Sequence, residues 1–153
     1  MELFLQRPDT NTLTQALDTL FVLARTSLNL KSVQTYVPAY DFLAQAVTLL
    51  DFDDVAELAS DSEQEVRANF VRCTSANFHN LASLLCQGEL YGHAVRFLMQ
   101  GCDLGERALR MHCRQGPANQ EEAWVILAQQ LYRRWELLGA CYTKVGDRKV
   151  RCV

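Results

Sequence analysis

The chain is poor in the two residues that most often break regular structure. Its 153 residues include three prolines and seven glycines. A β-sandwich needs many tight turns, and such turns rely on these residues, while disordered segments lack large apolar side chains. The composition disfavours both classes. Because 49% of the residues are apolar and 22% are charged, the chain can bury a sizeable core. Its length suits one domain, or a piece of a longer protein.

Long hydrophobic runs are missing too. No apolar stretch approaches the roughly 20 residues that a membrane-spanning helix needs. The first residues, MELFLQRPD, show neither a basic leader nor a small-residue cleavage site, so we expect no secretory signal. The six cysteines form no C-x-x-C pair and lie mostly among aliphatic residues, where a thiol behaves as a small hydrophobe. We therefore expect reduced thiols in a cytoplasmic or nuclear protein.

Basic residues are absent from one acidic stretch, residues 51–65, which carries seven Asp or Glu. Residues 1–66 hold eleven acids and three bases, a net charge of −8. Residues 67–153 hold seven acids and twelve bases, a net charge of +5. The two halves should present different surfaces to partners. We expect residues 51–65 to be a flexible acidic linker within a single helical domain of residues 1–153; a short helix inside the linker is the alternative.

What the chain has instead is helical periodicity. Apolar residues recur at three- and four-residue steps almost throughout, and no stretch alternates convincingly with the period of two that a strand shows. We predict an all-α chain of about five helices, arranged as irregular, tetratricopeptide-like antiparallel hairpins of a helical-repeat solenoid. The expected helices cover residues 10–28, 38–50, 62–88, 90–109 and 119–144.

Local signals mark some helix ends. Ser62 and Glu65 have the spacing of a capping box, and Gly88 is a natural stop. Gly101 and Gly105 lie on one side of their helix, which favours a close helix crossing; two merely tolerated glycines are the alternative. The apolar stripe of helix 62–88 carries Val66, Phe70, Cys73, Leu81, Leu84 and Leu85. That of helix 119–144 carries Trp124, Leu127, Ala128, Leu131, Trp135, Leu138 and Tyr142.

The stretch RWELLGACYTKVG carries a specific pattern. Tetratricopeptide repeats place a large aromatic, a leucine with a small residue, a tyrosine and a glycine near the turn at fixed spacing. The matching residues are Trp135, Leu138, Gly139, Tyr142 and Gly146. We expect Trp135 and Leu138 to fill the space between helices, Gly139 to admit a partner backbone, and a turn near Gly146. Where the pattern then expects alanine, the chain has Arg151.

A second, fuller copy of the pattern lies earlier in the chain. Its members are Phe78, Leu81, Ala82 and Leu85 on the first helix, and Ala94, Leu98 and Gly101 on the second. A hairpin of a solenoid buries its face against neighbouring hairpins and cannot do so alone. The face around Trp135 and Tyr142 should therefore be sticky and drive self-association, and we expect the chain to be cut from a longer protein.

Residues that carry chemistry do not form a recognisable site. His79 and Cys86 lie two helical turns apart, roughly 10 Å, whereas a nucleophile and its base need hydrogen-bond contact. His93 is nearer to Cys86, but no third orienting group is evident. His112 beside Cys113 does not match a zinc module. With no glycine-rich phosphate loop and no GxSxG elbow, we expect no catalytic, cofactor or metal site.

Basic residues gather towards the C-terminal side. Three of them have helical spacing, namely Arg107, Arg110 and Arg114, and two are adjacent on the last helix, Arg133 and Arg134. They suit a docking surface for an acidic peptide; a solvated basic face is the alternative. Nucleic acid is the weaker partner, because the chain is acidic overall and lacks interleaved exposed aromatics.

Four stretches together resemble the helical N-terminal region of fungal separases. They are LDTLFVLARTSL, TYVPAYDFL, NFVRCTSANFHNLASLLCQGELYGHAVRFLMQGCDLGERAL and RRWELLGACYTKVGDRK. The resemblance covers most of residues 12–149 and is weakest in the acidic linker. Its residues are packing and repeat positions, so it points to a scaffold. An unrelated tetratricopeptide-like adaptor of another assembly is the alternative.

The resemblance implies a parent enzyme whose chemistry lies elsewhere. Separases are cysteine endopeptidases that cut the kleisin subunit of cohesin when sister chromatids part, and their catalytic residues belong to a C-terminal caspase-like domain. Nothing in this sequence matches that domain. For this chain the resemblance implies a noncatalytic scaffold that engages the inhibitory chaperone securin, or helps position the kleisin substrate, by contact with the remainder of separase.

Overall fold

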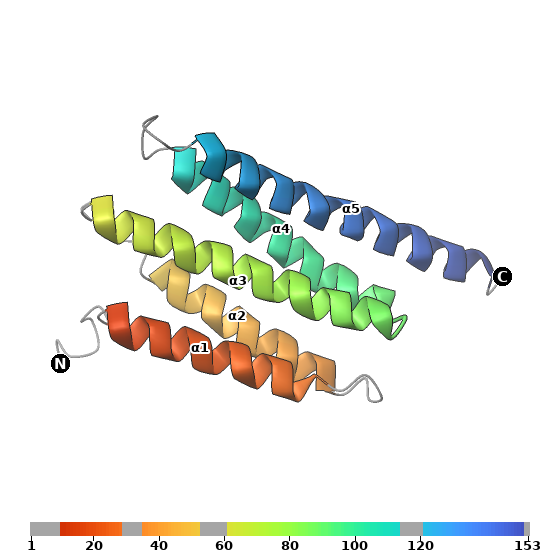
Figure 1. Ribbon diagram of the computed structural model, residues 1–153. Coiled ribbons are helices and arrows are strands. Elements are labelled where there is room, and N and C mark those ends of the chain that lie inside the picture. The colour runs from red at the N-terminus through yellow and green to blue at the C-terminus, as the bar shows by residue number, and fades with distance from the viewer. Residues whose placement is uncertain (1–9, 29–34, 53–60, 114–120, 152–153) are drawn as a thin grey trace. The chain divides into compact units, whose positions relative to one another are not determined.

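The computed structural model describes residues 10–28, 35–52, 61–113 and 121–151, and within these ranges the chain is all-α (Figure 1). Five helices follow one another, and no strand occurs among the described residues. The predicted fold class, helices in adjacent hairpins, is confirmed. None of the described helices is long and apolar enough to cross a membrane.

The residues group into two compact units, 1–58 and 59–153, and the boundary falls inside the acidic stretch. Residues 53–60 lie outside the described residues, so the expected flexible linker and the single domain stay predictions. The side chain of Ser62, the first residue of the predicted capping box, also lies outside the described part. The helix begins one residue before Ser62, at Asp61.

The first unit is a hairpin of α1 (Thr10–Ser27) and α2 (Tyr36–Phe52). The two helices run antiparallel (Figure 1). Their buried side chains are Leu13, Leu17 and Ala24 from α1 and Tyr36, Ala39, Leu43, Ala46 and Leu50 from α2. These residues are three, four or seven positions apart, as one apolar face on each helix requires.

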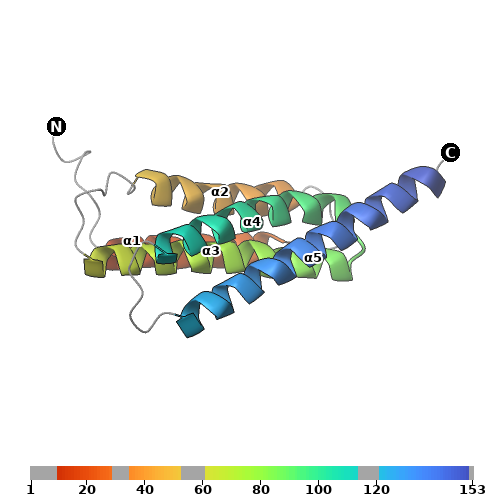
Figure 2. The same cartoon turned by 90° about the horizontal axis from the view of Figure 1, so that it is seen from above.

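The second unit contains α3 (Asp61–Gln87), α4 (Tyr91–Cys113) and α5 (Glu121–Arg151). α4 packs against both α3 and α5, and Figure 2 shows α5 crossing the other two helices at an angle. α3 and α4 run antiparallel because their connection is short. The buried apolar side chains are Val71, Phe78, Leu81, Ala82, Leu85, Ala94, Phe97, Leu98, Cys102, Leu104, Ala108, Leu131 and Cys141.

The turn between α3 and α4 is a Schellman motif. The amide of Leu90 donates to the carbonyl of Leu85 at 2.9 Å, and the amide of Glu89 donates to that of Cys86 at 3.0 Å. The residue in the left-handed conformation is Glu89, with φ of 60°, rather than a glycine. The helix does stop before Gly88, as predicted, but the left-handed position falls one residue later.

The two glycines of α4 make the close crossing that their spacing predicts. A Cβ at Gly101 would lie 3.3 Å from the Cβ of Phe78 on α3. A Cβ at Gly105 would lie 2.9 Å from a methyl of Leu131 on α5. Both glycines are buried, so α4 approaches α3 at one glycine and α5 at the next.

The buried side of α3 differs from the apolar stripe in its first half. Cys73 is exposed, and Thr74 and Ser75 take the buried positions instead. These polar residues can be buried because their hydroxyls are satisfied. Thr74 donates to the carbonyl of Phe70 at 2.8 Å, and Ser75 donates across to the carbonyl of Gly101 at 2.5 Å. A pattern that counts only apolar residues misses this face.

The turn expected near Gly146 is also wrong, because α5 continues through this glycine to Arg151. One glycine inside a helix costs about 1 kcal/mol relative to alanine, and no proline follows to stop the helix. Lys144, Arg148 and Lys149 close to it are good helix formers, so α5 tolerates the glycine.

Candidate functional site: the exposed face of α5

The most distinctive surface of the second unit is a stripe of apolar and small residues along α5, here called the α5 stripe. Its members are Val125, Ala128, Tyr132, Trp135, Gly139 and Tyr142. They are spaced by three and four residues in alternation, so they share one side of the helix. All are exposed except Ala128, which is half-buried. Large exposed side chains of this kind are uncommon in such a continuous row.

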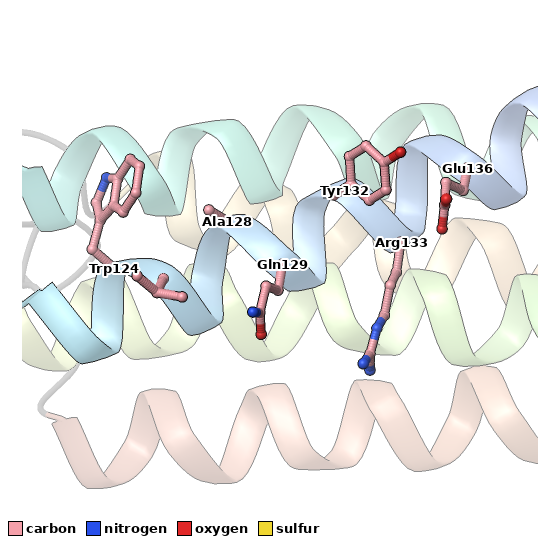
Figure 3. Close-up of a pocket in the computed structure, with 7 residues that line it drawn as sticks. Trp124, Ala128, Gln129, Tyr132, Arg133 and Glu136 are labelled. Atoms are coloured by element: carbon pink, nitrogen blue, oxygen red, sulfur yellow. The ribbon is translucent and has the colours of Figure 1, made fainter.

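The first part of the α5 stripe forms an open hollow of about 530 Å³. Its floor includes Ala128, between Trp124 and Tyr132, which lie on one side of α5 in Figure 3. Gln129 and Arg133 point to the other side (Figure 3). The two aromatic rings thus flank a small residue on this side of α5.

The second part of the α5 stripe repeats this arrangement. Gly139 is exposed, and a Cβ built on it would meet no atom within 4 Å. It lies between Trp135, which is 46% exposed, and Tyr142, which is 51% exposed. The hydroxyl of Tyr142 donates to the sulfur of Met99 on α4 at 3.4 Å, and Met99 is itself half exposed. The α5 stripe therefore continues onto the neighbouring helix.

The two copies of the repeat pattern end up in different surroundings. In the earlier copy Phe78, Leu81, Ala82 and Leu85 are buried on α3, and Ala94, Leu98 and Gly101 are buried on α4. In the later copy, Leu138 is half-buried, while Trp135, Gly139 and Tyr142 face solvent. No described helix of this unit covers that side of α5, so the packing role expected for Trp135, Gly139 and Tyr142 stays a prediction.

The described arginines of the predicted basic surface differ in exposure. Arg110 and Arg133 are exposed, and Arg107 is half-buried. Arg114 lies outside the described residues. Arg134 is 5% exposed, so it is not part of a docking surface, which corrects the prediction for this residue. On α5 it lies with Leu131 and Cys141 on the side that packs against α3 and α4.

Arg134 belongs to a buried polar junction between the three helices. One of its guanidinium nitrogens lies 3.4 Å from the place of a Cβ on Gly105, and its Nε is buried without a hydrogen-bond partner. Burial lowers the pKa of Arg134. Burial and the charge of Arg134 both lower the pKa of His79, whose Nδ1 is likewise buried without a partner.

The buried thiols of this unit are held in the protonated form. Burial raises the pKa of Cys102 to about 11, although the positive charge of Arg134 opposes the rise. Burial, followed by the interaction with Cys86, raises the pKa of Cys141 to about 12. Since the thiolate is the nucleophile, neither environment activates its cysteine.

A thiol pair that the sequence did not reveal lies between α3 and α5. The sulfur atoms of Cys86 and Cys141 are 3.3 Å apart. The residues are 55 positions apart in sequence, so no spacing rule pairs them. Helical spacing gives one usable signal: Leu131, Arg134, Leu138 and Cys141 follow one another at steps of three and four, which places them on a single side of α5.

The part of the chain that the structure describes brings together no three His, Cys, Asp or Glu residues that could hold a metal ion. The side chains of His112 and Cys113 lie outside that part. The protein was compared with family models, curated proteins and solved structures, and none of the three comparisons found a match.

Proposed function

We propose that this chain is a noncatalytic helical scaffold that binds an amphipathic helix of a protein partner along the α5 stripe. The observation that carries the proposal is the contrast between two faces of the same chain. Residues 78, 81, 82 and 85 on α3 have the spacing of residues 135, 138, 139 and 142 on α5. The α3 set is buried in the α3–α4 hairpin, whereas three of the four α5 residues are exposed.

The spacing of the α5 stripe favours a helix as the occupant. Alternating steps of three and four residues form the row that a facing helix fills, with large side chains placed over small ones. α4 provides the template, because Ala94, Leu98 and Gly101 present a small, a large and a small residue to α3. A partner helix of the same pattern would place its large residue over Gly139. The exposed stripe therefore favours a helical partner.

The sizes of the exposed side chains support an interface of useful area. An aromatic side chain buries about 150–250 Å² when it is fully covered. Trp124, Tyr132, Trp135 and Tyr142 are each about half exposed, so covering them would bury about 400 Å² on this side alone. With an equal area on the partner, these side chains would account for about 800 Å², roughly two thirds of the 1,200 Å² at the lower end of specific protein interfaces.

A finer proposal rests on the resemblance to fungal separases. In that case the chain is part of the helical scaffold of a cytoplasmic and nuclear cysteine endopeptidase, and its partner is securin or the cohesin kleisin. The protease activity would reside in another part of the parent protein. This finer proposal and the docking role of α5 can fail separately.

The test compares Gly139→Leu with Ala140→Leu. Both positions are exposed on α5, but residue 140 lies outside the α5 stripe. Binding is measured by fluorescence anisotropy with three labelled probes: a peptide copying residues 90–113, a securin peptide and a kleisin peptide. We expect Gly139→Leu to weaken binding at least about tenfold, which corresponds to about 1.4 kcal/mol, and Ala140→Leu to leave it unchanged.

The outcomes separate the two levels of the proposal. If the peptide of residues 90–113 binds, Gly139→Leu abolishes this binding, and neither securin nor kleisin binds, then the docking face is supported and the separase assignment is rejected. If both leucine variants bind the probes as well as the unmodified chain does, the docking role of the α5 stripe is rejected. Cleavage of the kleisin peptide by the isolated chain would show that the noncatalytic assignment is wrong.

A further inference from the structure

The attachment of α5 to the rest of its unit depends on few buried side chains. α5 is the longest described helix, with 31 residues, yet its buried side chains within the described part are Leu131, Arg134 and Cys141. One of them, Arg134, leaves its Nε without a partner, which costs free energy. A covalent link between α5 and α3 would therefore change the stability of this attachment substantially.

The Cys86–Cys141 pair lies where such a link can form. The two sulfur atoms are 3.3 Å apart, and a disulfide requires about 2.05 Å. They need to approach by about 1.3 Å, a displacement within the reach of side-chain motion in a packed protein. Cys86 is partly exposed and is the more accessible of the two, whereas Cys141 is 1% exposed.

We propose that Cys86 and Cys141 form a thiol-modification site that takes a low-molecular-weight disulfide, such as oxidised glutathione, and closes into an intramolecular disulfide between α3 and α5. The proposal rests on the proximity of the two sulfurs and their unequal exposure. It does not depend on the docking role of the α5 stripe.

The reaction proceeds by two thiol–disulfide exchanges. The thiolate of Cys86 attacks one sulfur of oxidised glutathione, the glutathione S–S bond breaks, and one glutathione thiolate leaves with a proton taken from solution. Cys141 then loses its proton and attacks the sulfur of Cys86. The bond from Cys86 to glutathione breaks, and the second glutathione leaves. Two protein thiols become one disulfide, and one oxidised glutathione becomes two reduced molecules.

The exposure pattern assigns an order to the two cysteines. Cys86 reacts first because it is the accessible member. Cys141 acts as the resolving thiol because it lies against Cys86 and is shielded from solvent. Its raised pKa, about 12, makes the second exchange slow at neutral pH, so a mixed disulfide with glutathione should accumulate briefly before the ring closes.

The other described cysteines provide internal comparisons. Cys73 is exposed, and Cys102 is buried. Neither has a second sulfur at hydrogen-bonding distance within the described helices. Cys73 should therefore stop at the mixed disulfide, and Cys102 should stay reduced. The proximity of a partner thiol, and not exposure alone, then decides where an intramolecular bond forms.

The experiment treats the full chain with oxidised glutathione, blocks remaining thiols with an alkylating reagent and maps the peptides by mass spectrometry. We expect a Cys86–Cys141 linked peptide that disappears on reduction. Hydrogen exchange of the oxidised chain should show amides around Cys141 in α5 exchanging at least about tenfold more slowly than in the reduced chain. Cys102→Ser should leave both results unchanged.

Cys86→Ser is the key variant, because residue 86 is partly exposed and the substitution should not unfold the protein. It should abolish the linked peptide and the slower exchange in α5. A second variant, Cys141→Ala, should trap glutathione on Cys86 as a stable mixed disulfide. The proposal is overturned if the unmodified chain keeps glutathione on Cys86 without closing the ring, or if other cysteine pairs link first.

Discussion

His79 should make the stability of the second unit depend on pH. Burial and the nearby charge of Arg134 lower its pKa in the folded protein, so the unfolded chain binds a proton more readily than the folded one. The stabilising contribution is therefore complete above the ordinary pKa of about 6.5 and is lost as the pH falls through the lower folded pKa. Urea unfolding should show a lower midpoint at about pH 5 than at about pH 8.

Two substitutions check that His79 is the cause. His79→Gln removes the titrating group and should flatten the dependence between these two pH values. His93→Gln, on α4, removes another partly buried histidine and should leave the dependence in place. If the wild type and His79→Gln lose stability in parallel as the pH falls, carboxylates elsewhere account for the effect.

Gly105 and Gly139 should respond in opposite ways to the same substitution. A Cβ at Gly105 would already lie 2.9 Å from Leu131, whereas one at Gly139 would meet nothing within 4 Å. Gly105→Leu should lower the free energy of unfolding by about 1–3 kcal/mol through overpacking. Gly139→Leu should raise it by up to about 1 kcal/mol, because leucine favours a helix more than glycine does. Chemical denaturation measures both, and equal effects would argue against the close α4–α5 crossing.

At the scale of the element, the α3–α4 turn holds a residue in an unfavourable conformation. Glu89 has a positive φ, which costs a residue with a Cβ about 1 kcal/mol relative to glycine. Glu89→Gly should therefore stabilise the hairpin by up to about 1 kcal/mol, as judged by its thermal midpoint. The comparison is Gln87→Gly, which places glycine at the last residue of α3 and should be destabilising. A lower midpoint for Glu89→Gly would mean that the Glu89 side chain contributes more than its backbone strain costs.

Substitution of Arg134 tests how α5 is held against α3 and α4. Replacing a buried, incompletely partnered charge by an apolar residue of similar length is often neutral or stabilising by about 1–4 kcal/mol. We expect Arg134→Met to fall in this range and also to raise the pKa of His79 towards its ordinary value, measured by NMR titration. Arg133→Met, at an exposed position, should do neither. A marked loss of stability in Arg134→Met would mean that the guanidinium makes favourable contacts that outweigh its burial.

The sequence predicts the helices of this protein better than their buried sides. The five periodic stretches all become helices, because periodicity over a long segment reports local preference. On α5, however, two apolar sides lie next to each other: Leu131 and Cys141 on one, Trp135 and Tyr142 on the other. Which side is buried depends on the neighbouring helices, and that information is not in the local pattern. Likewise the burial of Ser75 depends on a carbonyl of α4, and the contact of Cys86 with Cys141 depends on tertiary packing.

At the scale of the whole molecule, the α5 stripe predicts self-association at high concentration. Trp135 and Gly139 are four residues apart, so an antiparallel pair of α5 helices can place each tryptophan over the glycine of the other copy. Multi-angle light scattering should show a mass that rises with concentration, and Trp135→Ala should reduce it. A partner helix should compete with this association. A monomer at all concentrations would show that exposure of the stripe does not suffice for pairing.

The unbroken course of α5 through Gly146 has a mechanical consequence. At 1.5 Å per residue, 31 residues form a rod of about 46 Å. The helix is held by its buried contacts at Leu131 and Cys141, and its first and last turns lie on either side of these contacts. A tilt of about 5° around Leu131 would move a residue 20 positions away by about 2.6 Å. A partner bound at one end of α5 would thus displace the other end, with no change in the conformation of the helix itself.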